Sequence, residues 1–229
     1  MIDLCAGDGH WCDENQIHPS PYLFMKHAQH LIEKKGKHEC NLHLIEKSVA
    51  TFQELKSNCQ ATPFDIKPNF YCQDAGLWQF PRMKSNQAFM FNLDPNNASV
   101  IRSIVTDEFL NNLPLCTFGM ITLGCNASGV GRAKREYREE WQQATQSLID
   151  CTVRWHDTVL VWFKNDSHKW AYILRVPKRW TSKTIRKIEA LAKETSPFSI
   201  GILSQQQQRR EFNQQLHVLF TTKRERNEF

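Results

Sequence analysis

The chain has 229 residues, which is the size of one ordinary domain, so we expect a single domain over residues 1–229. Hydrophobic residues make up 41% and charged residues 23% of the sequence, and this composition excludes an intrinsically disordered chain. No apolar run approaches the roughly 20 residues that cross a bilayer. We therefore expect a cytoplasmic protein with no membrane association.

Strands and helices alternate in the first half of the chain. In chain order, the apolar spacing predicts a strand at 1–4, a helix at 20–33, a strand at 41–46, a helix at 48–58, and strands at 70–74, 88–94 and 118–123. The apolar run of the strand at 88–94 is typical of a parallel sheet covered on both faces by helices.

Two β runs, at 158–163 and 170–176, stand out in the second half, with predicted helices at 132–151 and 182–194 around them and a last strand at 215–221. The polar gap between the two runs suits a hairpin and is too short for a helical crossover, so the pair should be antiparallel. The fold class we expect is α/β: a Rossmann-like, mostly parallel sheet with an antiparallel hairpin at its C-terminal edge.

Acidic and glycine residues follow three consecutive predicted strands. Gly7 and Gly9, after Asp3, allow a tight turn close to a ligand, but the third glycine of the dinucleotide fingerprint is missing, which disfavours a nicotinamide cofactor. Glu46 ends the second strand, where a carboxylate would hold a ribose diol, and Asp74 could accept a hydrogen bond from an adenine amino group. The alternative is that these acids only cap turns.

The fourth strand ends in Asn92-Leu93-Asp94-Pro95-Asn96-Asn97. Amino-methyltransferases carry a polar-Pro-Pro-aromatic motif at this position, and Asp94 and Pro95 match its first half. We predict that Asn92, Asp94 and Pro95 are catalytic and that Asn96 and Asn97 contact the substrate. Because these two asparagines replace the second proline and the aromatic residue, stacking of a flipped base is not expected. An ordinary Asp-Pro-Asn turn explains the same residues about as well.

Glycines and small polar residues form the segment from Gly124 to Arg132. It lacks the Gly-Lys-Ser/Thr ending of a phosphate-binding loop, so nucleotide hydrolysis is not expected. We interpret it as a substrate-facing loop that offers Asn126 and Arg132. A helix N-terminus capped by a polar side chain is the alternative.

The formal net charge is +5, and basic clusters gather in the second half of the chain. They make DNA or RNA a candidate partner, bound through this half, although a solvated helix face with interleaved acids accounts for them equally well. The eight cysteines include no C-x-x-C pair and the histidines no H-E-x-x-H motif, so we expect reduced thiols and no metal site.

The chain resembles the three-Cys-motif partner family over most of residues 1–176. The resemblance is carried by Asp3-Leu4-Cys5-Ala6-Gly7-Asp8-Gly9, Ser20-Pro21-Tyr22-Leu23, Leu44-Ile45-Glu46-Lys47, Leu93-Asp94-Pro95 and the hairpin Leu160 to Val176. Gly7-Asp8-Gly9 replaces the family's Gly-Pro-Gly, and Asn96-Asn97 interrupts its Asp-Pro-Phe-Gly. The resemblance implies a class I methyltransferase-like core that binds S-adenosylmethionine (SAM).

The predicted SAM site comprises residues from the ends of three strands: Asp3, Ala6, Gly7, Asp8, Gly9, Glu46, Lys47, Asp74 and Ala75. The function we expect is a SAM-dependent methyltransferase that acts on a nucleic-acid nitrogen, with Asp94 orienting the nucleophile. Such a transfer depends mainly on proximity and orientation. The alternative is an inactive module of the same fold that binds nucleic acid or a partner protein.

Overall fold

The computed structural model describes residues 1–12, 14, 18–35, 39–79, 87–94, 103–106, 108–109, 113, 117–125, 158–163, 169–176, 183, 186–187, 190–191 and 198–202. The chain divides into two compact units, Met1–Asp94 and Pro95–Phe229. The single-domain organisation expected from the length stays a prediction.

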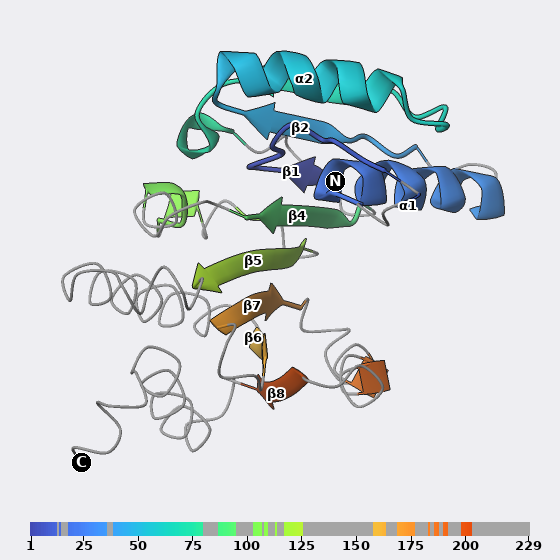
Figure 1. Cartoon of the computed structure of the whole chain (residues 1–229). Helices are drawn as coiled ribbons and strands as arrows, with labels where there is room; N and C mark the ends of the chain where they lie inside the picture. Colours follow the sequence, from blue (N-terminus) through green and yellow to red (C-terminus); the bar gives the residue numbers. More distant parts are fainter. Residues whose placement is uncertain are drawn as a thin grey trace. The chain divides into compact units, whose positions relative to one another are not determined.

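Four parallel strands form the sheet of the first unit. They are β1 (Ile2–Asp3), β2 (His43–Glu46), β3 (Asn69–Cys72) and β4 (Phe89–Leu93). Their order is β3-β2-β1-β4. Strand β1 pairs with both β2 and β4, and Figure 1 shows these three strands side by side. The carboxyl ends of all four strands therefore lie at one edge of this sheet.

Two helices connect the first three strands. The helix α1 (Ser20–Lys35) begins with Pro21 in its first turn, where a proline fits without losing a helical hydrogen bond. The helix α2 (Val49–Gln60) is capped by Ser48, whose hydroxyl accepts a hydrogen bond from Thr51 N. Both elements confirm the predicted helices, with boundaries shifted by one or two residues.

Both helices share a hydrophobic core with the sheet. In-register residues of neighbouring parallel strands project from the same face, so Asp3 of β1, Leu44 of β2 and Asn92 of β4 share one face. Leu44 packs there in a cluster with Phe24, Met25 and Ala28 of α1 and Leu55 and Cys59 of α2. Most of this face is apolar, which makes Asp3 and Asn92 exceptional among its buried residues.

The second unit contains β5 (Thr117–Cys125), β6 (Thr158–Phe163), β7 (Lys169–Arg175) and β8 (Phe198–Ile202) in the order β5-β7-β6-β8. All three pairings are antiparallel. The β6–β7 pairing agrees with the sequence, but its predicted place at the sheet edge is wrong, because β8 pairs along the outer side of β6.

Strand β8 was not predicted, and β5 is longer than expected. The predicted loop at Gly124 to Arg132 is wrong at its start, because Gly124 and Cys125 still pair with β7. The predicted helix at 132–151 and strand at 215–221 lie outside the described residues.

The strand order defines the fold class. Parallel strands in the order β3-β2-β1-β4, joined by helices, are Rossmann-like, and β7 runs antiparallel between β5 and β6. The chain thus has the Rossmann-like fold expected from its sequence. None of the helices in the described part of the chain is long and apolar enough to cross a membrane.

Candidate functional site

The turn that leaves β1 is attached to the end of β2. Ala6 N donates to Ile45 O at 3.0 Å, and Ala6 is buried. Gly7 and Gly9 both have positive φ angles, 64° and 63°, in the region that favours glycine. A Cβ at Gly9 would lie 2.8 Å from Leu55 Cδ1, whereas one at Gly7 would meet nothing within 4 Å. Gly9 therefore allows close packing on α2, and the space beside Gly7 is open.

The carboxylate of Glu46 is hydrogen-bonded to this turn. Its Oε2 accepts a hydrogen bond from Gly7 N at 3.1 Å, and its Oε1 accepts one from Ser48 N at 2.8 Å. A carboxylate offers about four acceptor positions. Two positions on Glu46 therefore remain available to further donors after both backbone bonds are made.

Lys47 and Asp74 form an ion pair between the ends of β2 and β3. Lys47 Nζ lies 2.6 Å from Asp74 Oδ2, and Asp74 Oδ1 accepts a hydrogen bond from Gly76 N at 2.9 Å. The hydrogen bond from Lys47, followed by that from Gly76, lowers the pKa of Asp74. The same hydrogen bond to Asp74 raises the pKa of Lys47. Asp74 also caps the short 3₁₀ helix η1 (Ala75–Leu77), in which Ala75 is buried.

Asp3 and Asn92 form a buried polar pair between β1 and β4. Asn92 Nδ2 donates to Asp3 Oδ1 at 3.1 Å, and both residues are at most 1% exposed. Burial raises the pKa of Asp3 to about 6, and the Asp94 carboxylate adds to the rise, while the Ser20 and Asn92 side chains and the Cys5 N–H oppose it. Asn92, predicted to be catalytic, thus has its side chain directed to Asp3.

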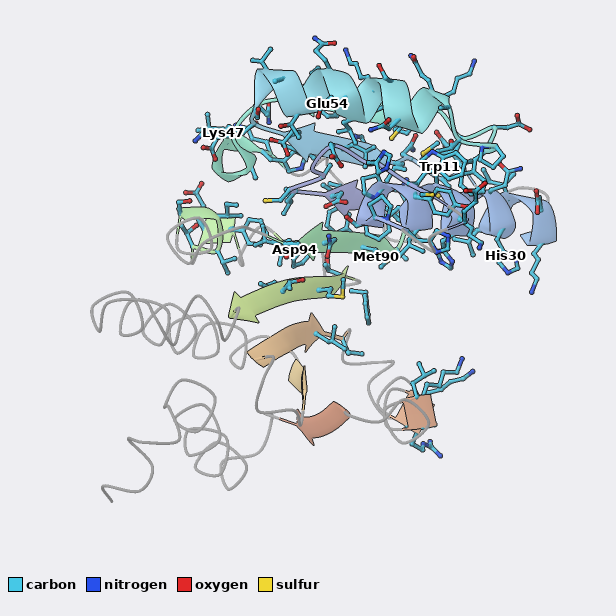
Figure 2. The ribbon with its side chains drawn as sticks, in the orientation of Figure 1. Trp11, His30, Lys47, Glu54, Met90 and Asp94 are labelled. Carbon is cyan, nitrogen blue, oxygen red and sulfur yellow. The ribbon has the colours of Figure 1, made fainter. Side chains whose placement is uncertain are left out.

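Burial and, after it, four carboxylates that the sequence assigned to the site raise the pKa of the Cys5 thiol. Burial raises the pKa of Cys5 to about 12, with further contributions, in descending order, from Asp3, Glu46, Asp94 and Asp74. Asp94 is exposed at the carboxyl end of β4. Figure 2 labels Lys47 and Asp94, which lie at the ends of the sheet toward which the arrowheads of β2 and β4 point. The first unit therefore concentrates negative charge at this edge.

Of the remaining predicted site residues, Asp8 is described by the structure and five others are not. The Asp8 carboxylate accepts a hydrogen bond from His10 N at 2.9 Å, and its carbonyl accepts one from Asn58 Nδ2 at 2.8 Å. Asp8 lines an open hollow of about 520 Å³ between the segment after β1 and α2, together with His10, Gln53, Glu54, Ser57 and Asn58. Pro95, Asn96, Asn97, Asn126 and Arg132 lie outside the described residues.

Two contributions were missed by the sequence interpretation. The backbone N–H of Ser48 fixes the second oxygen of Glu46, and backbone donors carry no residue-type signal. The Asp3–Asn92 pair did have a signal, because Asn92 is the one polar residue in the strand sequence Phe-Met-Phe-Asn-Leu. Within the described ranges, no three or more His, Cys, Asp or Glu side chains form a group that could hold a metal ion.

Comparisons with known proteins add structural similarities at low identity. No protein-family model matches the chain, and no curated protein matches it. Protein LPL1258 from Legionella pneumophila is 12% identical, with 88% of this chain and 86% of that chain covered and a TM-score of 0.49. An uncharacterised protein from Listeria monocytogenes is 11% identical, with 96% and 88% covered and a TM-score of 0.47.

The plantazolicin methyltransferase BamL, solved in complex with a triazolic desmethylPZN analog and SAH, is 14% identical. The match covers 77% of this chain and 76% of that chain, with a TM-score of 0.45. Because all three TM-scores are below 0.5, the fold assignment depends on strand order and helix placement.

Proposed function

We propose that the chain binds SAM at the carboxyl ends of β1, β2 and β3 and is a SAM-dependent methyltransferase. The observation that carries the proposal is the position of Glu46, whose carboxylate lies beneath the glycine turn and is held by Gly7 N and Ser48 N. Open α/β sheets bind ligands outside the carboxyl ends of their strands. This edge is therefore the expected place for a nucleoside.

The ribose of SAM fits the chemistry of Glu46. Its two hydroxyls are hydrogen-bond donors on adjacent carbons, and each oxygen of Glu46 keeps one acceptor position after its backbone bond. The backbone bonds hold the carboxylate in one orientation before a ligand arrives. Such preorganisation lowers the entropy lost on binding.

The adenine would lie toward η1. Asp74 can accept a hydrogen bond from the adenine amino group, provided that the base shares or replaces Lys47 on its Oδ2. Leu77 is 75% exposed and offers apolar surface beside this position. Asp74 and Leu77 belong to one short element, so the polar and apolar contacts to a base would be fixed together.

The charge of the site favours a cationic ligand. Glu46, Asp74 and Asp94 are carboxylates at the strand ends, and their summed charge stays negative after Lys47 pairs with Asp74. Like charges in one crevice raise the local concentration of an oppositely charged ligand. SAM carries a positive sulfonium, whereas its demethylated product has a neutral sulfur, so this field distinguishes the two.

Asp94 is the residue we assign to the methyl acceptor. When bound, SAM supplies an electrophilic methyl group that passes to a nucleophile while the sulfonium becomes a thioether. Asp94, exposed at the end of β4, would accept a hydrogen bond from an acceptor N–H and orient the nitrogen lone pair. The chemistry of this residue is orientation, which is a large part of catalysis when two substrates must meet.

We infer a nucleic acid as the acceptor from the basic residues of the second unit. Lys183, Arg186 and Lys187 are helical and exposed, and their spacing of three and four residues puts them on one helix face. Such a face suits contacts to phosphates. The same residues support the second candidate, a module of this fold that binds nucleic acid without methyl transfer.

Calorimetry with SAM tests the proposal. Wild type and Glu54→Ala should bind SAM equally, because Glu54 is exposed on α2 away from the strand ends (Figure 2). Glu46→Ala should bind at least about tenfold more weakly, since it loses the hydrogen bonds that the ribose hydroxyls would donate to a charged carboxylate. No binding by wild type at millimolar SAM would refute the cofactor and the enzyme together.

Methyl transfer needs a second assay. Wild type and Asp94→Asn would be incubated with SAM labelled in its methyl group and with fragmented DNA or total RNA as acceptor. Labelled nucleic acid with wild type and at least about a tenfold loss with Asp94→Asn support the enzyme. SAM binding with nucleic-acid binding but no label transfer supports the module.

A further inference from the structure

Two buried acceptor atoms in the Asp3–Asn92 pair have no hydrogen-bond partner. Asn92 Nδ2 donates to Asp3 Oδ1 at 3.1 Å, which leaves Asp3 Oδ2 and Asn92 Oδ1. Neither of these oxygens is exposed, and neither has a hydrogen bond to any described residue. Both atoms belong to the same pair, and both are acceptors.

Unpaired buried acceptors are costly, and a buried charged one is costlier. A buried polar atom without a partner loses its hydration, and a buried charge without a partner costs more free energy still. Neutral hydrogen-bond donors, the Ser20 and Asn92 side chains and the Cys5 N–H, favour a negative charge on Asp3, but burial opposes it more strongly. Asp94 at the end of β4 is itself a carboxylate, and Cys5 beside β1 and Cys59 on α2 are thiols whose pKa is raised by burial and then by Asp3.

We propose that a proton bound at Asp3 Oδ2 donates to Asn92 Oδ1, so that the two side chains form a closed acid–amide pair. One added hydrogen satisfies both acceptors at once, since Oδ2 becomes a donor and Asn92 Oδ1 receives its bond. Asp3 takes this proton from solvent and keeps it when the chain folds below the pH at which the buried carboxyl ionises. No charge is then buried between β1 and β4.

Burial is the physical reason that Asp3 keeps this proton more tightly than an ordinary aspartate. It raises the pKa of Asp3 to about 6, and the neighbouring Asp94 acts in the same direction. The neutral pair is therefore the main form below about pH 6, and the charged form gains population above it.

The pair has a positioning role that does not depend on the identity of the ligand. Leu4 N donates to Asn92 O at 2.9 Å in the ladder, so the side-chain pair adds a second link between the ends of β1 and β4. The glycine turn follows β1, and Asp94 follows β4. A tight Asp3–Asn92 pair thus fixes the spacing of these two parts, whether or not the chain is an enzyme.

Titration of the wild-type protein, followed by NMR of aspartates labelled with ¹³C at the carboxyl carbon, tests the proposal. Asp3→Asn assigns the signal, because the resonance of Asp3 is absent from its spectrum. We expect the Asp3 carboxyl to titrate near pH 6, well above the ordinary value of about 3.9. A midpoint at or below that ordinary value would mean an anionic Asp3 and would overturn the proposal.

Asp3→Asn is also an isosteric copy of the protonated pair. Its amide can donate to Asn92 Oδ1 and accept from Asn92 Nδ2. The variant should therefore fold, and its urea midpoint of unfolding at pH 7.5 should be no lower than that of wild type. Asp65→Asn makes the same change at an exposed aspartate and is the matched control. If Asp3→Asn fails to fold, or unfolds earlier while Asp65→Asn does not, the native pair needs the anion and the proposal is wrong.

Discussion

Gly7 and Glu46 are 39 positions apart in the sequence, and the backbone N–H of Gly7 donates to Glu46 Oε2 at 3.1 Å. This bond ties the turn after β1 to the end of β2 before any ligand is present. Replacement of Glu46 by Gln should destabilise the fold by about 1–3 kcal/mol, because the amide has only one acceptor oxygen for two backbone N–H donors. Urea unfolding measures the loss.

Glu54→Gln is the control for this change, since it removes one charge from an exposed position on the neighbouring helix. Surface substitutions of this kind usually change stability by no more than about 0.5 kcal/mol. Equal unfolding midpoints for both variants would show that the Gly7–Glu46 bond adds nothing to the fold.

The two glycines of the turn should differ in their tolerance of alanine. Gly7→Ala should cost about 1–2 kcal/mol for a left-handed backbone. Gly9→Ala carries the same backbone cost and also brings a Cβ to 2.8 Å from Leu55 Cδ1, which adds about 1–3 kcal/mol for overpacking. Urea unfolding of the two variants checks the order, and Gly7→Ala being the less stable would contradict the packing of Gly9 on α2.

Asp3 should make the stability of the protein depend on pH in a defined direction. Its pKa is raised from 3.8 to about 6 in the fold, so between these values the native state binds more protons than the unfolded state. The contribution of Asp3 is fully present below about pH 4 and is lost as pH rises through about 6, amounting to about 3 kcal/mol at most.

Unfolding curves of wild type and Asp3→Asn between pH 4 and pH 7.5 isolate this contribution, because other titrating groups affect both proteins alike. The free energy of unfolding of Asp3→Asn should increase relative to that of wild type as pH rises. A constant difference across the range would mean that Asp3 keeps one charge state.

Asp94 should discriminate between SAM and its demethylated product. Its carboxylate adds to the negative charge of the strand ends, and the sulfonium is the charge that the product lacks. Asp94→Asn should weaken SAM binding by about two- to tenfold, as expected for one partly screened charge, and leave product binding nearly unchanged. Calorimetry with both ligands measures the two ratios. An equal loss of affinity for SAM and for its product would point to a lost hydrogen bond or a disturbed fold.

Lys47 should compete with the adenine for Asp74. The ion pair at 2.6 Å occupies Asp74 Oδ2, and Lys47 is well exposed, so the pair itself stabilises the protein little. Lys47→Met frees Asp74 and should tighten SAM binding by up to about fivefold, the range of an exposed ion pair. Lys26→Met, at an exposed lysine on α1, is the matched control. Weaker binding by Lys47→Met would show that Lys47 itself contacts the ligand.

Much of the first unit could be predicted because its signals are local. The spacing of Phe52 and Leu55 predicted α2, and Ser48 marked its start. The apolar run at Phe89–Leu93 predicted a strand covered on both faces. Acids at strand ends were predicted to converge because parallel strands place their carboxyl ends together, and Glu46 does contact the glycine turn.

The features that were missed depend on long-range pairing. Strand β8 was not predicted, and its register on β6, from Val159–Ile202 to Phe163–Phe198, is set by a partner distant in the sequence. Asn92 was assigned to catalysis because it precedes Asp94, yet alternation along β4 turns its side chain toward Asp3. A polar residue in an apolar strand indicates a buried partner, but sequence alone does not identify that partner.

A crystal structure of the chain with SAM tests the central proposal most directly. We expect the ribose hydroxyls within hydrogen-bond distance of Glu46 and the adenine amino group beside Asp74, with the Gly7–Glu46 bond retained. A nucleoside in the hollow lined by Asp8 and His10, or a Glu46 carboxylate with no ligand contact at saturating SAM, would contradict the proposed site.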